Sequence, residues 1–156
     1  MALALAALAA CSRYEVREEA LAAEPCAAPD CVCEDETRCE LDCQGDACEL
    51  GCADVNVCDM SCGDDCQYEC ESSTDCSLLC ADSCSATCDD GATCAVDCGE
   101  DCDVLCTEVA ECRVAMRSGI ATCRDVSQCV VDCLVSGELE PAIDCGGGVF
   151  ACGACP

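Results

Sequence analysis

Cysteine and apolar residues alternate with polar residues in short segments along most of the chain. From Cys33 onward, many segments read Cys-x-Φ-x-Cys, where Φ is apolar and x is mostly Asp, Ser, Glu or Gln. Because successive side chains of a strand point to opposite faces, this spacing places both cysteines and Φ on one face of a five-residue strand. Segments such as Gly63-Asp64-Asp65 and Gly99-Glu100-Asp101 predict tight turns between the strands.

The cysteine spacing also repeats over a longer distance. After Cys58 the intervals between consecutive cysteines are 4, 4, 4 and 6 residues, and the series begins again at Cys76 and at Cys94. The period is therefore 18 residues, and a first unit from Cys39 carries one extra residue in its turn. A fixed period of this length predicts a repeat architecture in which each unit stacks on its neighbours.

We therefore predict an all-β fold, a small disulfide-stapled right-handed β-solenoid whose coils of about 18 residues each contain two short strands. Two alternatives share the same spacing. One is an irregular array of disulfide loops, and the other is helical, because 18 residues also make five turns of α-helix. Recurrent Gly, Asp, Ser and Thr at fixed positions favour the solenoid over the helix. The predicted Φ columns are Leu41, Met60, Leu78, Val96, Val114 and Val131 in the first strands, and Leu50, Tyr68, Ala86 and Val104 in the second.

The composition indicates what stabilises such a fold. The chain has 156 residues, of which 27 are cysteine, and its only aromatic residues are Phe150, Tyr14 and Tyr68. A large conventional core is therefore not expected. A cysteine content above about a tenth is typical of a disulfide scaffold in an exported protein and of metal thiolates in the cytosol. The regular spacing and the lack of His favour disulfides.

The first ten residues, MALALAALAA, form an apolar segment that is too short to span a bilayer and predicts a signal peptide. The segment Leu8-Ala9-Ala10-Cys11 resembles the lipobox of bacterial lipoproteins. The resemblance implies that Cys11 is acylated and that the exported protein is anchored by this lipid at the bacterial outer membrane or cell surface. Setting Cys11 aside leaves 26 cysteines of the 27, an even number that can pair completely.

These features divide the chain into four parts. Residues 1–10 are the predicted signal peptide, and residues 11–30 are a lipid-anchored tether. Residues 31–140 form the cysteine-rich solenoid, and residues 141–156 form a C-terminal disulfide cap. Within the cap, Cys152-Gly-Ala-Cys155 is interpreted as a local bridge rather than a redox pair, because no βαβ pattern surrounds it.

The unit that begins at Cys112 indicates how the cysteines pair. Met116 replaces its second cysteine and Gly119 replaces its third. Partners that are lost together leave no orphan thiol, so the second and third cysteines of each intact unit are predicted to pair across the turn. These pairs are Cys43–Cys48, Cys62–Cys66, Cys80–Cys84 and Cys98–Cys102.

The fourth cysteine of each unit has two candidate partners, the first cysteine of its own coil and the first cysteine of the next coil. The ends of the array favour the next coil, because Cys33–Cys39 and Cys123–Cys129 then close without a missing partner. The other pairs of this scheme are Cys52–Cys58, Cys70–Cys76, Cys88–Cys94 and Cys106–Cys112.

The formal net charge of −27 restricts the partners of the protein. Residues 34–111 contain 23 carboxylates and one cation, Arg38. Because this surface repels phosphates, we expect no nucleic-acid binding. The acidic turns are a candidate Ca²⁺ site, but the Gly-Gly-x-Gly-x-Asp repeat of known Ca²⁺ solenoids is absent, which favours a solvated acidic edge and no required cofactor. The candidate ligands are Asp46, Asp64, Asp65, Asp82, Glu100 and Asp101.

Catalysis has little support in this sequence. General acid–base chemistry usually needs His, Lys or a carboxylate in a cleft, and a thin solenoid offers no obvious pocket. The sequence therefore predicts a non-enzymatic lipoprotein that acts as an acidic structural or interaction rod, with an unidentified protein or cell-surface partner. Sequestration of Ca²⁺, other divalent cations or soft metals is the alternative function.

Overall fold

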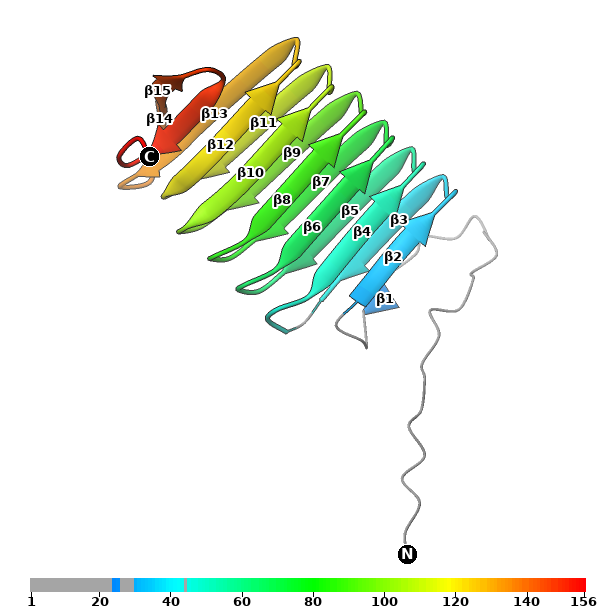
Figure 1. Ribbon diagram of the computed structural model, residues 1–156. Helices are drawn as coiled ribbons and strands as arrows, with labels where there is room; N and C mark the ends of the chain where they lie inside the picture. Colours follow the sequence, from blue (N-terminus) through cyan, green and yellow to red (C-terminus); the bar gives the residue numbers. More distant parts are fainter. Residues whose placement is uncertain (1–23, 26–29, 44) are drawn as a thin grey trace, which may run out of the picture.

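The computed structural model describes residues 24–25, 30–43 and 45–156, and every regular element in these ranges is a strand. It confirms an all-β solenoid of about six coils that follow the 18-residue repeat (Figure 1). The predicted signal peptide (1–10), the lipid site Cys11 and nearly all of the tether (11–30) lie outside the described residues.

The strands form two eight-stranded sheets, one on each side of the solenoid. The first sheet contains, in spatial order, β1 (Glu24–Pro25), β3 (Arg38–Asp42), β5 (Val57–Cys62), β7 (Asp75–Cys80), β9 (Thr93–Cys98), β11 (Glu111–Met116), β13 (Gln128–Val135) and β14 (Glu138–Pro141). The second contains β15 (Ile143–Gly146), β16 (Val149–Cys152), β12 (Gly119–Arg124), β10 (Cys102–Thr107), β8 (Ser85–Asp89), β6 (Gln67–Glu71), β4 (Glu49–Ala53) and β2 (Asp30–Glu34).

Corresponding positions of consecutive coils lie next to each other in parallel strands. Cys58 pairs with Cys76, and Cys76 pairs with Cys94, in steps of one repeat. The step is one residue longer between Cys39 and Cys58, where the first unit carries one extra residue in its turn, and one residue shorter between Cys112 and Cys129. The cysteine columns thus stay aligned although two of the turns differ in length by one residue.

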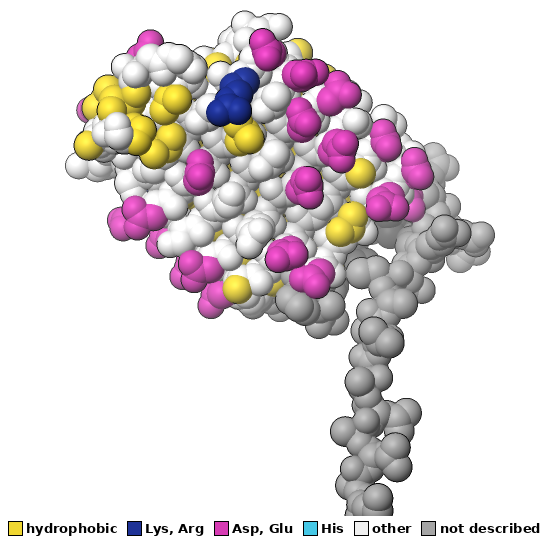
Figure 2. Space-filling model, in the orientation of Figure 1, with side chains coloured by type: hydrophobic (Ala, Val, Ile, Leu, Met, Phe, Trp, Pro, Cys, Tyr) yellow, Lys and Arg dark blue, Asp and Glu magenta, His cyan; other side chains and the backbone are white. Residues whose placement is uncertain are grey.

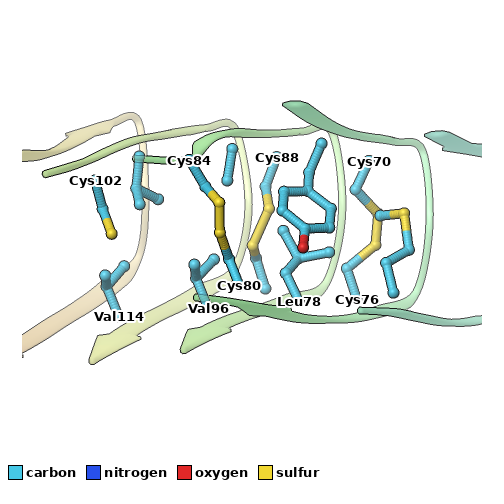
Figure 3. Close-up of a cluster of buried hydrophobic side chains, with 14 of the residues drawn as sticks. Cys70, Cys76, Leu78, Cys80, Cys84, Cys88, Val96, Cys102 and Val114 are labelled. Atoms are coloured by element: carbon cyan, nitrogen blue, oxygen red, sulfur yellow. A yellow bond between two sulfur atoms is a disulfide. The ribbon is translucent and has the colours of Figure 1, made fainter. Parts of the chain in front are cut away.

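The interior consists of the predicted Φ columns between cysteine bridges. In β7, for example, Cys76, Leu78 and Cys80 are buried, whereas the residues between them are exposed. Figure 3 shows Leu78, Val96 and Val114 following one another along the solenoid, with bridges spanning the space between the two sheets. Each coil therefore has a thin interior in which sulfur replaces much of the usual hydrocarbon.

A further interior column, which the alternation of Cys and Φ does not predict, runs through the loops. It consists of the third loop residue of successive coils, and Val55 and Val109 in it are 1% and 2% exposed. Ser73 takes the same place between them and is buried as well, accepting a hydrogen bond from the Val55 amide (3.3 Å) and donating one to the Glu71 carbonyl (3.1 Å). The buried Ser73 hydroxyl therefore has hydrogen-bond partners both as an acceptor and as a donor.

Left-handed backbone explains why Asp recurs at fixed positions. Most coils have one such residue in the loop and one in the turn, with φ between 49° and 59°. Asp and Asn tolerate this conformation better than most residues with a side chain. The positions are Asp35, Asp54, Ser72, Asp90, Glu108 and Asp125 in the loops, and Ala47, Asp65, Ser83 and Asp101 in the turns.

Antiparallel strands close the C-terminal end. β14 pairs with β13, and β16 pairs with both β12 and β15. The antiparallel pairing begins at Glu138, three residues before the predicted start of the cap at residue 141. The polypeptide thus changes direction at the last coil and covers its end.

The predicted bridge within Cys152-Gly-Ala-Cys155 is wrong, because Cys152 pairs with Cys133 and Cys155 pairs with Cys145. Antiparallel pairing places Cys152 beside Gly119, and parallel pairing places Cys133 beside Met116. Cys133 and Cys152 therefore occupy the places that the second and third cysteines of a sixth coil would take. They close that coil with a strand of opposite direction.

Candidate functional site

Two columns of disulfides follow the two edges of the solenoid. The structure joins every pair that was predicted from the repeat, with Cα atoms 6.3–6.7 Å apart. We call the column at the turns the turn edge; it contains Cys43–Cys48, Cys62–Cys66, Cys80–Cys84 and Cys98–Cys102. We call the column at the loops the loop edge; it contains Cys33–Cys39, Cys52–Cys58, Cys70–Cys76, Cys88–Cys94, Cys106–Cys112 and Cys123–Cys129.

Along the loop edge the structure decides between the two pairings that the sequence allowed. The fourth cysteine of each coil is joined to the first cysteine of the next coil, as in Cys70–Cys76. Bridges at the turn edge close a single coil, whereas bridges at the loop edge connect one coil to the next. Together they fix both the cross-section of each coil and its attachment to the following one.

Sulfur atoms of neighbouring bridges lie close to one another along both edges. Five groups of three cysteines have all their Sγ atoms within 4.8 Å, and each group contains one complete bridge and one sulfur of the adjacent bridge. The groups are Cys43, Cys48 and Cys62; Cys80, Cys84 and Cys98; Cys58, Cys70 and Cys76; Cys88, Cys94 and Cys106; and Cys112, Cys123 and Cys129.

Such a group could hold a soft metal only after reduction. The thiolate is the form of cysteine that binds metals, and these cysteines are disulfide-bonded. Among the described residues, groups of three or more metal-binding side chains at this spacing contain cysteine alone. The chemistry that the arrangement supports in an oxidising compartment is therefore that of disulfides.

The two edges differ at the fifth coil. On the turn edge, Met116 lies between Cys98 and Cys133 in the strand register and is fully buried. It fills the space that a bridge occupies in the other coils. On the loop edge the bridges continue to Cys123–Cys129, both of whose residues are half-buried.

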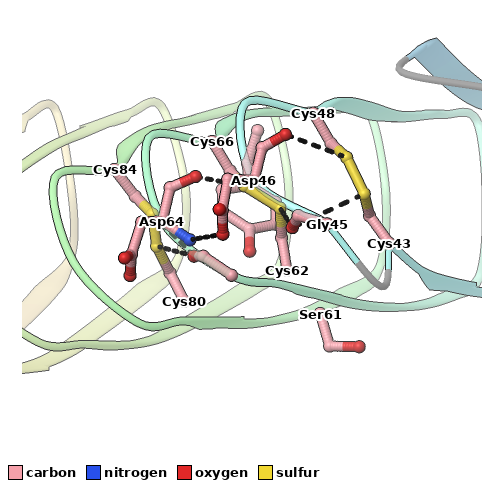
Figure 4. The surroundings of a disulfide bond; sticks show 12 residues. Cys43, Gly45, Asp46, Cys48, Ser61, Cys62, Asp64, Cys66, Cys80 and Cys84 are labelled. Atoms are coloured by element: carbon pink, nitrogen blue, oxygen red, sulfur yellow. Dashed lines mark hydrogen bonds between the residues drawn. A yellow bond between two sulfur atoms is a disulfide. The ribbon is translucent and has the colours of Figure 1, made fainter.

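Four of the six acidic turn residues considered as Ca²⁺ ligands form a ladder of side-chain to backbone hydrogen bonds. Oδ1 of Asp46 accepts from the Asp64 amide (3.1 Å), as Figure 4 shows. Oδ1 of Asp64 accepts from the Asp82 amide (3.1 Å). Oδ1 of Asp82 in turn accepts from the Glu100 amide (2.7 Å). Each of these carboxylates therefore connects its own coil to the next through a charge-assisted bond.

The remaining two candidate ligands, Asp65 and Asp101, occupy left-handed turn positions with φ of 57° and 56°. The backbone amide of Asp65 donates to the Asp82 carbonyl (2.9 Å), and that of Asp101 donates to the Ser118 hydroxyl (2.9 Å). The structure thus distributes the six acidic residues along the turn edge instead of gathering them around one point. Their positions follow from the backbone requirements of the turns.

The outer surface carries shallow depressions, and its exposed apolar side chains are unevenly distributed. One depression of about 260 Å³, open to solvent, lies over β8, β10 and β12 and is lined by Ser85, Thr87, Asp103, Leu105, Thr122 and Arg124. Figure 2 shows acidic side chains over much of the face in view and apolar ones gathered at the C-terminal end. Exposed apolar side chains at that end are Leu134, Val135, Leu139 and Ile143.

The fold and its bridges define the class of this protein as a disulfide-stapled β-solenoid. Comparison with protein families, curated proteins and solved structures gives no match for the chain. Among the described residues, no helix has the length and hydrophobicity needed to cross a membrane.

Proposed function

We propose that this protein is an exported, lipid-anchored and non-enzymatic rod that presents an acidic surface in an oxidising compartment. The observation that carries the proposal is the closure of successive coils by disulfides on both edges. Disulfides persist in secreted and cell-surface proteins and are rare in the reducing cytosol. A chain whose thin interior consists largely of paired cysteines depends on that environment.

The cysteine count supports a separate role for one residue near the N-terminus. All 25 cysteines of the described residues are disulfide-bonded, and the sequence contains two more, Cys11 and Cys26. A complete set of pairs needs only one of these two. Because Cys11 ends the lipobox-like segment, we assign it to the lipid and anchor the rod through its N-terminal end.

The charge distribution supports an interaction role for the exposed faces. Residues 34–111 carry 23 carboxylates and only Arg38 as a cation, and Arg38 is itself paired with Glu40 (2.7 Å) and Asp59 (2.9 Å). Such a surface attracts basic partners at low ionic strength and repels nucleic acid and anionic lipid head groups. We propose a basic protein or cell-surface component as the partner.

Intact mass and thiol counting after expression of the full chain in a bacterial host test the proposal. The expected mature protein begins at an acylated Cys11, contains 26 oxidised cysteines and sediments with the membrane fraction. The Cys11→Ser variant is expected to lack the acyl chains and to leave the membrane fraction. Numerous free thiols in freshly exported protein, or unchanged membrane retention of Cys11→Ser, would contradict the proposal.

A calorimetric titration with Ca²⁺ separates this function from cation sequestration. We expect only weak, salt-sensitive heats, because one oxygen of Asp46, Asp64 and Asp82 already accepts a backbone hydrogen bond. Saturable binding at a defined stoichiometry that Asp64→Asn abolishes would instead favour a protein that sequesters divalent cations.

A further inference from the structure

We infer that the loop edge is a thiol–disulfide relay, along which a thiolate introduced at one bridge moves from coil to coil while the solenoid stays folded. The observation behind this inference is the contact between neighbouring bridges. Cys112 lies within 4.8 Å of both sulfurs of Cys123–Cys129, and Cys106 lies within 4.8 Å of both sulfurs of Cys88–Cys94. The relay does not depend on the lipid anchor.

The relay starts at the C-terminal bridge of the loop edge. Cys123 and Cys129 are both half-buried, whereas Cys106 and Cys112 are fully buried. Among the bridges of the loop edge, a dithiol reductant therefore reaches Cys123–Cys129 first. It transfers two electrons and two protons to this bridge and is itself oxidised to a disulfide.

Each following step is redox-neutral. The Cys123 thiolate attacks Sγ of Cys112, so that a Cys112–Cys123 bond forms, the Cys106–Cys112 bond breaks and the electron pair leaves on Cys106. The Cys106 thiolate then attacks Sγ of Cys94, which forms Cys94–Cys106 and leaves the thiolate on Cys88. The thiolate has then moved two coils towards the N-terminus.

The exchanged bridges are compatible with the same stack. Cys112–Cys123 and Cys94–Cys106 each join the first and fourth cysteines of a single coil. This is the second pairing that the 18-residue spacing permits, and its sulfurs are already neighbours in the structure. Exchange therefore shifts the loop edge from pairing between coils to pairing within coils, without separating the strands.

The turn edge provides an internal contrast. Cys133 is followed along its column by Met116, whose thioether carries no exchangeable bond. A thiolate at Cys133 therefore has no disulfide in the adjacent coil to attack. The relay is expected along the loop edge and not from the C-terminal end of the turn edge.

The test uses the oxidised full-length protein with Cys129→Ser, which leaves Cys123 without its partner. The protein is held at mildly alkaline pH, quenched with acid, and alkylated with a maleimide in denaturant at acid pH, where exchange is frozen. Peptic peptides are then mapped by mass spectrometry. We expect label on Cys106 and Cys88 as well as on Cys123, together with new Cys112–Cys123 and Cys94–Cys106 bridges and an unchanged turn edge.

The matched control is Cys152→Ser, which leaves Cys133 as the single thiol. Its label is expected to stay on Cys133. Label confined to Cys123 in the first variant would overturn the relay, and so would label scattered over both edges or movement away from Cys133 in the control.

Wild-type protein keeps the inference testable if Cys129→Ser does not fold. The wild-type protein is treated with limiting dithiothreitol and then alkylated with the maleimide in the same way. We expect each molecule that is reduced at Cys123–Cys129 to carry one maleimide on Cys129 and a second one on Cys123, Cys106 or Cys88. Label on Cys123 and Cys129 alone would overturn the relay. The same measurement is repeated with the Cys11→Ser variant, which lacks the proposed lipid. Because the relay does not depend on the lipid, the same labelling pattern is expected there, and a failure of the proposed anchoring leaves this result unchanged.

Discussion

Gly119 and Gly153 have nearly the same backbone conformation but very different surroundings. Their φ values are +133° and +130°, in a region that residues with a side chain rarely adopt. A Cβ on Gly119 would collide with the backbone nitrogen and carbonyl oxygen of Cys102, whereas a Cβ on Gly153 would meet no heavy atom within 4 Å. The two glycines therefore separate the effect of conformation from that of close backbone approach.

We predict that Gly119→Ala destabilises the oxidised protein by at least about 2 kcal/mol more than Gly153→Ala does. Both variants share the strain of the positive φ, but only the first must push β10 away from β12. Denaturant unfolding followed by circular dichroism measures the difference. Equal destabilisation by the two substitutions would show that β10 and β12 do not approach each other as closely as described.

Tyr68 stabilises the fold at neutral pH, and this contribution is lost at alkaline pH. Its hydroxyl donates to the Leu79 carbonyl (2.7 Å), and burial raises the pKa of this hydroxyl above its ordinary value. Because the unfolded chain loses the proton first, at a pKa of about 10, the contribution is present below that pH and is lost as the pH rises towards the folded-state pKa.

Spectroscopic titration of the Tyr14→Phe variant isolates Tyr68, because the chain has two tyrosines. Phenolate absorbance is expected well above pH 10, together with loss of the strand spectrum. In Tyr68→Phe, the free energy of unfolding is expected to be lower at neutral pH. Its decrease at alkaline pH is expected to be smaller than in the wild type. A normal tyrosine titration in folded Tyr14→Phe protein would contradict the buried hydroxyl.

At the scale of elements, the turns and loops determine how coils attach to one another. The acidic ladder combines two opposing effects, since each carboxylate accepts a backbone hydrogen bond but also lies near carboxylates of adjacent coils. The sequence showed the column of acids at a one-coil spacing. It did not show the hydrogen bonds, because these depend on which turn amides point along the solenoid axis.

We predict that Asp82→Ala and Asp82→Asn have opposite consequences. Alanine removes the acceptor of the Glu100 amide and is expected to lower the free energy of unfolding by about 1 kcal/mol. Asparagine keeps an acceptor oxygen and removes repulsion from Asp64 and Glu100, so stability is expected to equal or exceed that of the wild type at low salt and to converge with it at high salt. Thermal unfolding at two ionic strengths makes the comparison, and equal losses in both variants would exclude the hydrogen-bond ladder.

At the scale of the whole molecule, the bridges take the place of a large hydrophobic core. Each short bridge stabilises the fold by about 2 kcal/mol through the loss of loop-closure entropy in the unfolded chain. Small Φ residues such as Ala86 and Val104 bury comparatively little area in each coil. The solenoid therefore depends on many bridges that act together.

Complete reduction at neutral pH without denaturant is accordingly expected to abolish the strand signal in circular dichroism. Mass spectrometry of the alkylated product verifies that reduction is complete, and untreated protein carried through the same alkylation is the control. A strand spectrum that persists in the fully reduced chain would show that the hydrophobic columns suffice.

The sequence by itself determined the repeat, the strand faces and the bridges of the turn edge, whereas the structure decided between the two pairings that the sequence allowed along the loop edge. The sequence was sufficient for the first three because cysteine, Φ and turn residues recur at fixed intervals, and because Met116 and Gly119 replace two partners together. The tertiary structure alone decided the loop column that contains Ser73, the hydrogen-bond ladder and the partners of Cys152 and Cys155. These features depend on which groups meet across coils and on the reversal of chain direction at the cap, and the spacing of the cysteines specifies neither.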